Sequence, residues 1–298
     1  MLMKIYDCFM YFDEDVVLDV RLNVLNKYVD KFVIIESIFN HKGEKRKPLF
    51  DINKFQSFKY KINYILLETQ PDNLEEIHKN DDKNEIYRKS IFNAWKRENF
   101  QRNKIQNGLR DADVNDWIII SDLDEIPNLE SLNLKEIKDK FVFFKQHQIY
   151  YKFNLRLENY NWIGSKSCRY KDLKSPQWLR DIKSKKFGWW RFDTFFSKNK
   201  FIGIKFIEDG GWHFSYLKNP KDIETKLKSY LHHIDYDQNP LGENKIANLI
   251  KERKTVYNLK VDQRVSKFNS QNDLKKIDMN LLPKYINDNQ TQLKEWLD

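Results

Sequence analysis

Ile118-Ile119-Ile120-Ser121-Asp122-Leu123-Asp124-Glu125 is the stretch that decides the fold of this 298-residue chain. Its first half is a short apolar run, which is typical of a parallel strand buried on both faces. Its second half is acidic and follows at once, so the strand carries carboxylates to its own carboxyl end. Because side chains alternate along an extended chain, we expect Asp122 and Asp124 to point the same way. In open α/β sheets, ligands bind beyond this end of the strands.

Strand and helix signals alternate around this stretch. Hydrophobic patterns predict strands at residues 4–9, 31–37, 60–67 and 116–121, and helices at 13–28 and 86–109. Asp13 is a candidate cap for the first helix. On the second helix we expect four apolar residues to lie on one side: Ile91, Trp95, Ile105 and Leu109. Further along, we predict strands at 141–151, 191–196 and 201–207, and helices at 220–233, at 244–258 and before Trp296. This alternation predicts an α/β fold with a mostly parallel sheet flanked by helices.

Composition narrows the classes of protein that fit. The net charge is +9, with 33% charged and 40% hydrophobic residues, as in soluble globular proteins. The basic residues are spread singly and form no arm or stripe, so we expect no nucleic-acid partner. Cys8 and Cys168 form no CxxC pair, which argues against a zinc site built on cysteine and fits a reducing compartment. No apolar stretch reaches membrane length, so we expect no transmembrane segment and a cytoplasmic protein.

The acidic stretch suits a divalent cation. Mg²⁺ and Mn²⁺ take oxygen ligands, and they bind through one or two carboxylates together with the phosphates of a substrate. Asp122 and Asp124 are therefore candidate metal ligands facing a nucleotide diphosphate. When the diphosphate leaves, the cation neutralises the negative charge that develops on it. The alternative is a solvated acidic turn closed by Pro127.

A second candidate segment runs from Glu208 to Tyr216 and contains two adjacent glycines and His213. Paired glycines let the backbone approach a ligand closely, and a neutral imidazole binds a metal or a phosphate. Asp209 or Glu208 is a candidate general base for an acceptor hydroxyl. Taken by itself, the segment also fits a β-turn with a core tryptophan and a hydrogen-bonded histidine.

A third segment lies on the helix predicted at 86–109. Glu98 and Arg102 stand one helical turn apart and can form an ion pair. Such a pair usually belongs to a solvated helix face. Near a carboxylate site, however, Arg102 would orient the carboxylates or bind a phosphate through both of its terminal nitrogens.

Together these segments resemble glycosyltransferase family 17, which includes the enzyme that adds the bisecting N-acetylglucosamine to N-glycans. Several matching segments in one order are more specific than any single motif, and they cover roughly the first four-fifths of the chain. The resemblance rests on residues 5–12, 21–23, 29–37, Trp95, Glu98, 101–103, 121–127 and 211–215, followed by Lys226 and His232 or His233.

The resemblance implies a GT-A type fold and an inverting, metal-dependent transfer, with a nucleotide-sugar donor that is UDP-linked N-acetylglucosamine and a glycan hydroxyl as acceptor. It implies Mn²⁺ or Mg²⁺ on Asp122 and Asp124, with His213 as a third ligand. It places the base at Asp209, with Glu208 as the other candidate. The expected donor-binding residues are Cys8, Phe9, Glu36, Arg102, Asp122 and Lys226, and the expected acceptor-binding residues are Trp212 and Tyr216.

The same resemblance sets the expected domain organisation. Residues 1–258 form the predicted catalytic domain, with a nucleotide-sugar-binding half at 1–127 and an acceptor-side half at 128–258. Residues 259–298 form a predicted C-terminal helical extension. We expect the chain to lack the membrane anchor of secretory-pathway members. This expectation favours a bacterial or viral glycan as acceptor, and the cytoplasm of a bacterial cell, or of a host cell, as location.

Three other classes of protein stay open. A nucleotidyltransferase also uses carboxylates and metal at strand ends, but it releases pyrophosphate from a triphosphate. A non-enzymatic carbohydrate-binding protein would bind glycans through its aromatic residues without needing the acidic cluster. A basic nucleic-acid binder would show salt-sensitive binding, but no recognition motif is present.

Overall fold

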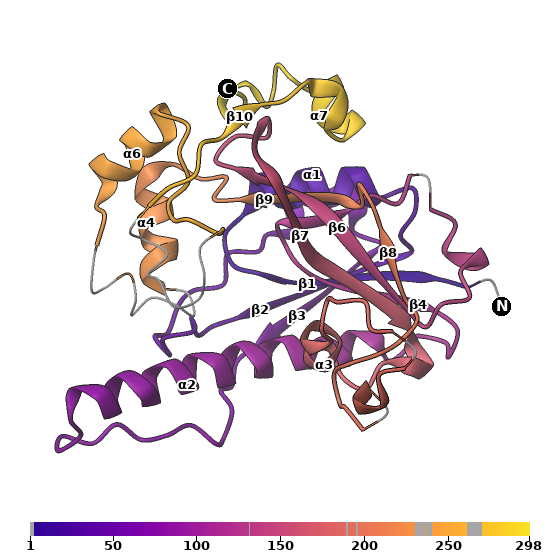
Figure 1. Ribbon diagram of the computed structural model, residues 1–298. Helices are drawn as coiled ribbons and strands as arrows, with labels where there is room; N and C mark the ends of the chain where they lie inside the picture. Colours follow the sequence, from indigo (N-terminus) through magenta and orange to yellow (C-terminus); the bar gives the residue numbers. More distant parts are fainter. Residues whose placement is uncertain are drawn as a thin grey trace.

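The computed structural model of the chain describes residues 3–130, 132–188, 190–194, 196–229, 236, 240–260 and 270–298. The strands among these residues form one ten-stranded sheet in the order β3-β2-β1-β4-β7-β6-β9-β5, with β8 beside β6 and β10 beside β7 (Figure 1). The strands are β1 (Ile5–Tyr11), β2 (Lys31–Ser37), β3 (Ile62–Leu67), β4 (Trp117–Asp122), β5 (Glu125–Pro127), β6 (Phe141–Tyr150), β7 (Leu155–Arg169), β8 (Ile204–Ile207), β9 (Gly211–Ser215) and β10 (Lys275–Lys276).

The first four strands of the sheet are parallel, and the sheet continues through β7, which runs antiparallel to β4. The strands predicted for this half of the chain are confirmed, with shifts of at most two residues at their ends. Successive side chains of β1 face opposite sides of the sheet. Phe9 packs in the hydrophobic cluster beneath α1, and Cys8 packs in the cluster that contains Ile105 and Leu109.

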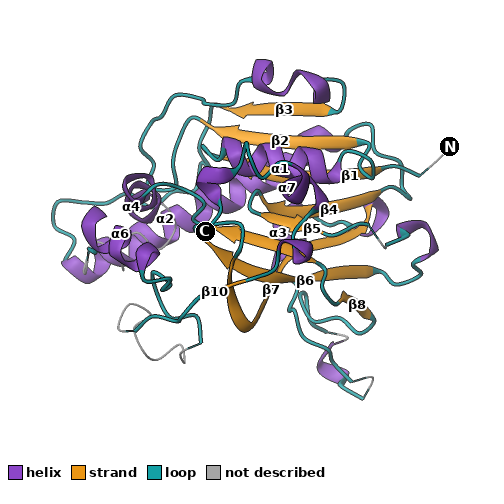
Figure 2. Cartoon of the chain, turned by 90° about the horizontal axis from the view of Figure 1, so that it is seen from above, coloured by secondary structure: helices purple, strands orange, loops and turns teal. Residues whose placement is uncertain are grey.

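Helices cover both faces of this sheet (Figures 1 and 2). Helix α1 lies on one face, and α2 and α3 lie on the other. Helices α4 and α6 pack together in a third cluster with Tyr150 and Tyr151 at the end of β6. The predicted α/β class with helices flanking a sheet is therefore confirmed. The α-helices are α1 (Asp15–Leu25), α2 (Lys83–Asn103), α3 (Pro176–Asp181), α4 (Pro220–Ser229), α6 (Glu243–Lys251) and α7 (Lys284–Asp288). The 3-10 helices are η1 (Ile52–Phe58), η2 (Lys104–Leu109), η3 (Leu134–Glu136), η4 (Tyr170–Asp172), η5 (Phe192–Thr194), η7 (Met279–Leu281) and η8 (Lys294–Trp296).

Some local predictions are wrong. Residues 191–196 were expected to form a strand, but they contain the 3-10 helix η5 within a loop. The long strand β7 was not expected, because its sequence has no sustained apolar run. Asp13 does not cap α1, since the capping position is Glu14 and Asp13 forms an ion pair with Lys218. Trp95 was expected on the same side as Ile105 and Leu109, but it is 47% exposed whereas those two residues are fully buried.

The C-terminal residues belong to the same core as the sheet. The strand β10 pairs with β7, and Leu282, Ile286 and Leu293 pack in the cluster beneath α1. The sheet also runs across the predicted boundary after residue 127, since β4 and β7 are neighbours. The division into halves and an extension stays a prediction. None of the described helices combines the length and apolar character needed to cross a membrane.

Candidate active site

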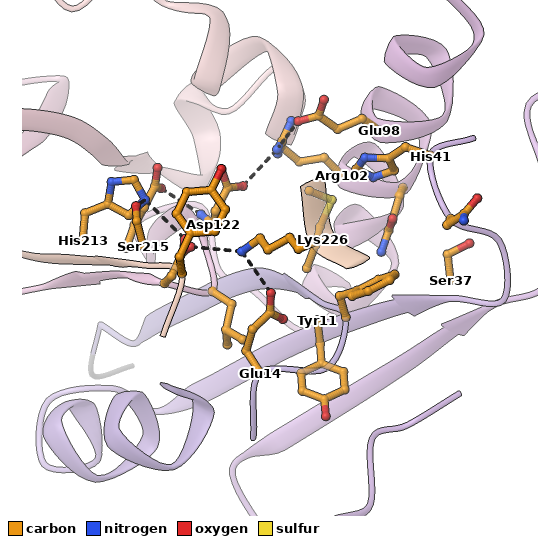
Figure 3. A pocket seen from close by; sticks show the side chains of 18 of the residues that line it. Tyr11, Glu14, Ser37, His41, Glu98, Arg102, Asp122, His213, Ser215 and Lys226 are labelled. Atoms are coloured by element: carbon orange, nitrogen blue, oxygen red, sulfur yellow. Dashed lines mark hydrogen bonds and ion pairs between the residues drawn. The ribbon is translucent and has the colours of Figure 1, made fainter. Parts of the chain in front are cut away.

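A cavity of about 430 Å³ opens at the carboxyl ends of β1, β2 and β4 (Figure 3). This is the size range of small-molecule sites, and the edge of the sheet is the one expected for ligands. Helix α2 contributes Glu98 and Arg102 to its wall, β4 and the following turn contribute Asp122 and Asp124, and α4 contributes Lys226. Residues far apart in the sequence therefore meet at one place.

Asp122 is held between two guanidinium groups. Its Oδ1 accepts a hydrogen bond from Arg102 at 2.9 Å, and its Oδ2 accepts one from Arg180 at 3.1 Å. Burial alone would raise the pKa of this carboxyl, but Arg180 and Arg102 outweigh burial and lower the pKa to about 2. Both oxygens of this carboxylate are thus already occupied by cationic side chains.

Asp124 is held more loosely. The Nζ atom of Lys226 lies 3.5 Å from Oδ2, and the Nε2 atom of His213 lies 3.6 Å from Oδ1. Burial would raise the pKa of Asp124, but Lys226 and His213 together keep it well below the ordinary value. The carboxylate therefore stays ionised, and its contact with His213 is too long for a hydrogen bond.

His213 is oriented by two polar neighbours. Its Nδ1 lies 2.8 Å from Oε1 of Gln148, and its Nε2 lies 3.1 Å from the hydroxyl of Ser215. Gln148 also donates from Nε2 to that hydroxyl at 2.8 Å. Because the amide oxygen of Gln148 can only accept, Nδ1 donates to it, while Nε2 and the Ser215 hydroxyl share the second hydrogen bond. The Nε2 atom of His213 thus faces the carboxylate of Asp124 in the cavity wall.

The turn that carries the carboxylates is built by Arg21 of α1. Its guanidinium binds both oxygens of Asp7 at 2.8 and 2.6 Å. It also donates to the backbone carbonyls of Asp122, Leu123 and Glu125 at 3.0, 3.0 and 2.8 Å. The side chains of Arg21 and Asp7 are fully buried. This ion pair fixes the path of the chain between β4 and β5.

Glu125 holds the other side of the turn. Its carboxylate accepts hydrogen bonds from Trp162 Nε1 at 2.6 Å and from Arg180 at 2.6 and 3.0 Å. The ring of Trp162 also lies 5.1 Å from that of His213. Arg180 and Trp162 were not predicted from the sequence, because no local pattern marks them. They come from α3 and β7, and only the folded chain brings them to the carboxylates.

The structure gathers six of the predicted site residues at the cavity. They are Arg102, Asp122, Asp124, His213, Tyr216 and Lys226.

Three predicted donor-binding residues lie away from the cavity lining. Cys8 and Phe9 are fully buried in the two clusters on either side of the sheet. Glu36 is also fully buried, and it accepts hydrogen bonds from the backbone of Leu49 and from Tyr64. Through the hydrogen bond from Leu49, Glu36 therefore holds the backbone of the loop after β2 in place.

The predicted catalytic and acceptor residues of the 208–216 segment are placed differently from one another. Trp212 is buried, and its Nε1 donates to the carbonyl of Leu281, because alternation along β9 turns it away from the face of His213. Asp209 is 85% exposed beside His147. Glu208 is 66% exposed and pairs with Lys145. None of these three lines the cavity, and His232 and His233 lie outside the described residues.

The charge of the wall is unbalanced. Five carboxylates line the cavity, against the three cationic side chains of Arg46, Arg102 and Lys226. Arg180 adds one positive charge behind Asp122, so negative charge still exceeds positive charge. Among the described residues, no three His, Cys, Asp or Glu side chains converge on a point where they would hold a metal by themselves.

An α/β sheet with a ligand-sized cavity at its strand ends, lined by acidic and basic groups, is the arrangement of a small-molecule site in an α/β enzyme. The chain belongs to glycosyltransferase family 17, whose family model matches residues 1–297. The protein is therefore a glycosyltransferase, with a sugar donor and an acceptor as substrates. A search of curated proteins finds no match.

Proposed function

We propose that this enzyme is of the GT-A type and transfers N-acetylglucosamine, with inversion, from a UDP-linked donor to a hydroxyl of a glycan, with Mn²⁺ or Mg²⁺ bound. The observation that carries the proposal is the meeting of Asp124, His213 and Lys226 at the strand-end cavity. Family membership supports sugar transfer, and the parallel half of the sheet supports a nucleotide site at this edge.

The excess negative charge of the wall favours a divalent cation. A nucleotide diphosphate is itself an anion, and placing it beside surplus carboxylates is unfavourable without added positive charge. Asp124 Oδ1 and His213 Nε2 stand 3.6 Å apart. Two ligands each about 2.1 Å from one ion stand roughly 3.0–3.5 Å apart, so a side-chain movement of a few tenths of an ångström would let these two atoms share a cation.

The side chains around His213 fit such a role. A histidine that binds a metal usually donates its other ring nitrogen to an oxygen acceptor, as Nδ1 does here to Gln148. Donor phosphates and water would supply the remaining ligands. We assign Asp124 and His213 as the protein ligands. Asp122 was predicted as a metal ligand; we propose instead that it holds Arg102 and Arg180 in place, because both of its oxygens accept hydrogen bonds from them.

The remaining roles follow from charge and shape. When bound, the cation neutralises charge on the departing diphosphate. Lys226 and Arg102 present further positive charge on the same wall, where a phosphate can accept their hydrogen bonds. Trp162, Tyr216 and Tyr257 line the cavity and offer aromatic faces to a sugar ring. The base stays a prediction at Asp209 or Glu208.

The test is release of UDP from a panel of nucleotide sugars, with Mn²⁺ or with a chelator. UDP-N-acetylglucosamine with Mn²⁺ is expected to give the fastest release, and Asp124→Asn is expected to lower it at least about 100-fold. Asp193→Asn is the matched control, because this carboxylate lies on a loop that does not line the cavity. Full turnover in the chelator refutes the metal role.

Two further measurements refine the assignment. The anomeric configuration of the product, read by NMR, decides whether the transfer inverts. An Asp209→Asn variant tests the base, because loss of turnover with normal donor binding supports Asp209. Wild-type turnover in that variant moves the assignment to a carboxylate that lines the cavity.

A further inference from the structure

The segment between α3 and β8 combines basic and aromatic residues. Residues 183–200 contain six lysine and arginine residues against a single acidic residue, Asp193. We call the described part of this segment, residues 183–188, 190–194 and 196–200, the basic-aromatic loop. Positive charge therefore gathers in this segment, although the sequence was expected to spread its basic residues singly.

Three aromatic side chains of this loop face water. Trp190 is 64% exposed, Phe192 is 76% exposed and Phe196 is 91% exposed. None of them belongs to the three hydrophobic clusters of the described core. Large apolar side chains gathered in an exposed segment mark a surface that contacts another phase or molecule.

The cationic side chains of the loop are only partly neutralised within the protein. Asp193 accepts hydrogen bonds from Arg191 at 2.7 Å and from Lys200 at 2.8 Å. Among the residues that the structure describes, Lys183, Lys185 and Lys198 have no carboxylate within ion-pair distance. Positive charge therefore flanks the exposed aromatic residues on both sides in the sequence.

The loop projects from the body of the protein. Figure 2 shows it, with the short helix η5, extending beyond β6 and β8 and away from the sheet. It directly continues α3, the helix whose Arg180 binds Asp122 and Glu125. A partner bound to this loop is thus joined by one short helix to the active site.

We propose that the basic-aromatic loop docks the enzyme on an anionic lipid surface. Tryptophan and phenylalanine enter the boundary between headgroups and acyl chains, and lysines are attracted to anionic headgroups. A projecting tip with exposed aromatic residues and flanking lysines presents both features at once. A single-stranded nucleic acid would instead need a groove that follows its backbone, and this segment is a protrusion.

The experiment is co-sedimentation of the full chain with vesicles of phosphatidylcholine alone or mixed with phosphatidylglycerol. Binding is expected only to the mixed vesicles, and it is expected to weaken as salt is raised. Each lysine near such a surface contributes about fivefold, so the combined substitutions Lys183→Glu, Lys185→Glu and Lys198→Glu should weaken partitioning on the order of 100-fold or more. Trp190→Ala, Phe192→Ala and Phe196→Ala together test the aromatic contribution and should weaken it at least about tenfold.

Matched controls separate the loop from general surface charge. Lys59→Glu, Lys245→Glu and Lys251→Glu reverse three exposed lysines elsewhere, and Tyr60→Ala removes an aromatic side chain that is 89% exposed. These variants should partition within about twofold of the unchanged chain after correction for net charge.

Three outcomes would overturn the proposal. The first is equal weakening by the control and loop variants, and the second is unchanged partitioning of both loop variants. The third is binding of the loop to an oligonucleotide, or to a second copy of the chain, while mixed vesicles stay unbound. Because all substituted side chains are exposed, unchanged thermal unfolding confirms that each variant is folded.

Discussion

Replacing Arg21 with methionine tests how the acidic turn is held in place. Methionine keeps much of the side-chain volume but removes the partner of Asp7, which is fully buried. Leaving one member of a buried ion pair unpartnered costs about 3–5 kcal/mol. The carbonyls of Asp122 and Leu123 also lose the Arg21 donor, whereas that of Glu125 keeps a hydrogen bond from Ser165. Each buried group left unpaired costs about 1–3 kcal/mol unless water reaches it. Arg21→Met should therefore lower the free energy of unfolding by at least about 3 kcal/mol.

A double-mutant cycle separates charge pairing from support of the turn. Urea unfolding is measured for the unchanged chain, Arg21→Met, Asp7→Asn and the double variant. The double variant removes both buried charges, so it should be less destabilised than the sum of the single variants by about 2 kcal/mol or more. It still lacks the hydrogen bonds of Arg21 to the turn. Its UDP release should therefore stay low, although its stability partly recovers.

Either of two results would refute this reasoning. Additive effects within about 0.5 kcal/mol would show that Asp7 and Arg21 do not act as a coupled buried pair. Full UDP release in the double variant would show that the hydrogen bonds of Arg21 do not position the carboxylates.

Three other predictions concern the surroundings of the site. In Gly164→Ala, the new Cβ would overlap the carboxylate of Glu125. Because that carboxylate must then move away from Arg180, both the melting temperature and the rate of UDP release should fall. Gln148→Leu removes the acceptor for Nδ1 of His213, and Mn²⁺ affinity measured by calorimetry should fall about 10–100-fold; unchanged affinity would argue against His213 as a ligand. Burial lowers the pKa of Lys166 from 10.5 to about 7. Between these values the unfolded chain binds more protons, so the free energy of unfolding should rise with pH between about pH 7 and 9, and Lys166→Met should flatten that slope; an equal slope in both proteins would show that Lys166 is not responsible.

The parallel half of the fold was predictable because its signals are local. The apolar runs at 32–35 and 117–120 are short enough to predict buried strands, and the acidic residues at the end of β4 follow directly. The antiparallel half of the sheet has weaker strand signals in its sequence. Strand β7 is half polar because part of it faces solvent, and its identity depends on pairing with β4 and β6.

The strand predicted at residues 191–196 is wrong for a related reason. Aromatic residues are typical of strands, and the sequence cannot say whether they are buried. In the folded protein Phe192 and Phe196 are exposed on a projecting loop. Likewise, Asp209 has the chemistry of a base, but its position in the β8–β9 connection leaves it beside His147 and away from the cavity lining.

The sequence was sufficient to locate the first four strands and the acidic segment at the end of β4, because each depends on residues that are close together in the chain. It also indicated the family, because several segments match in one order. Tertiary structure alone decided which cations face those carboxylates. Arg180 reaches Asp122 from 58 residues away, and Lys226 reaches Asp124 from 102 residues away. Hydrophobic periodicity is a local property, whereas electrostatic pairing depends on distances that exist only after the sheet has formed.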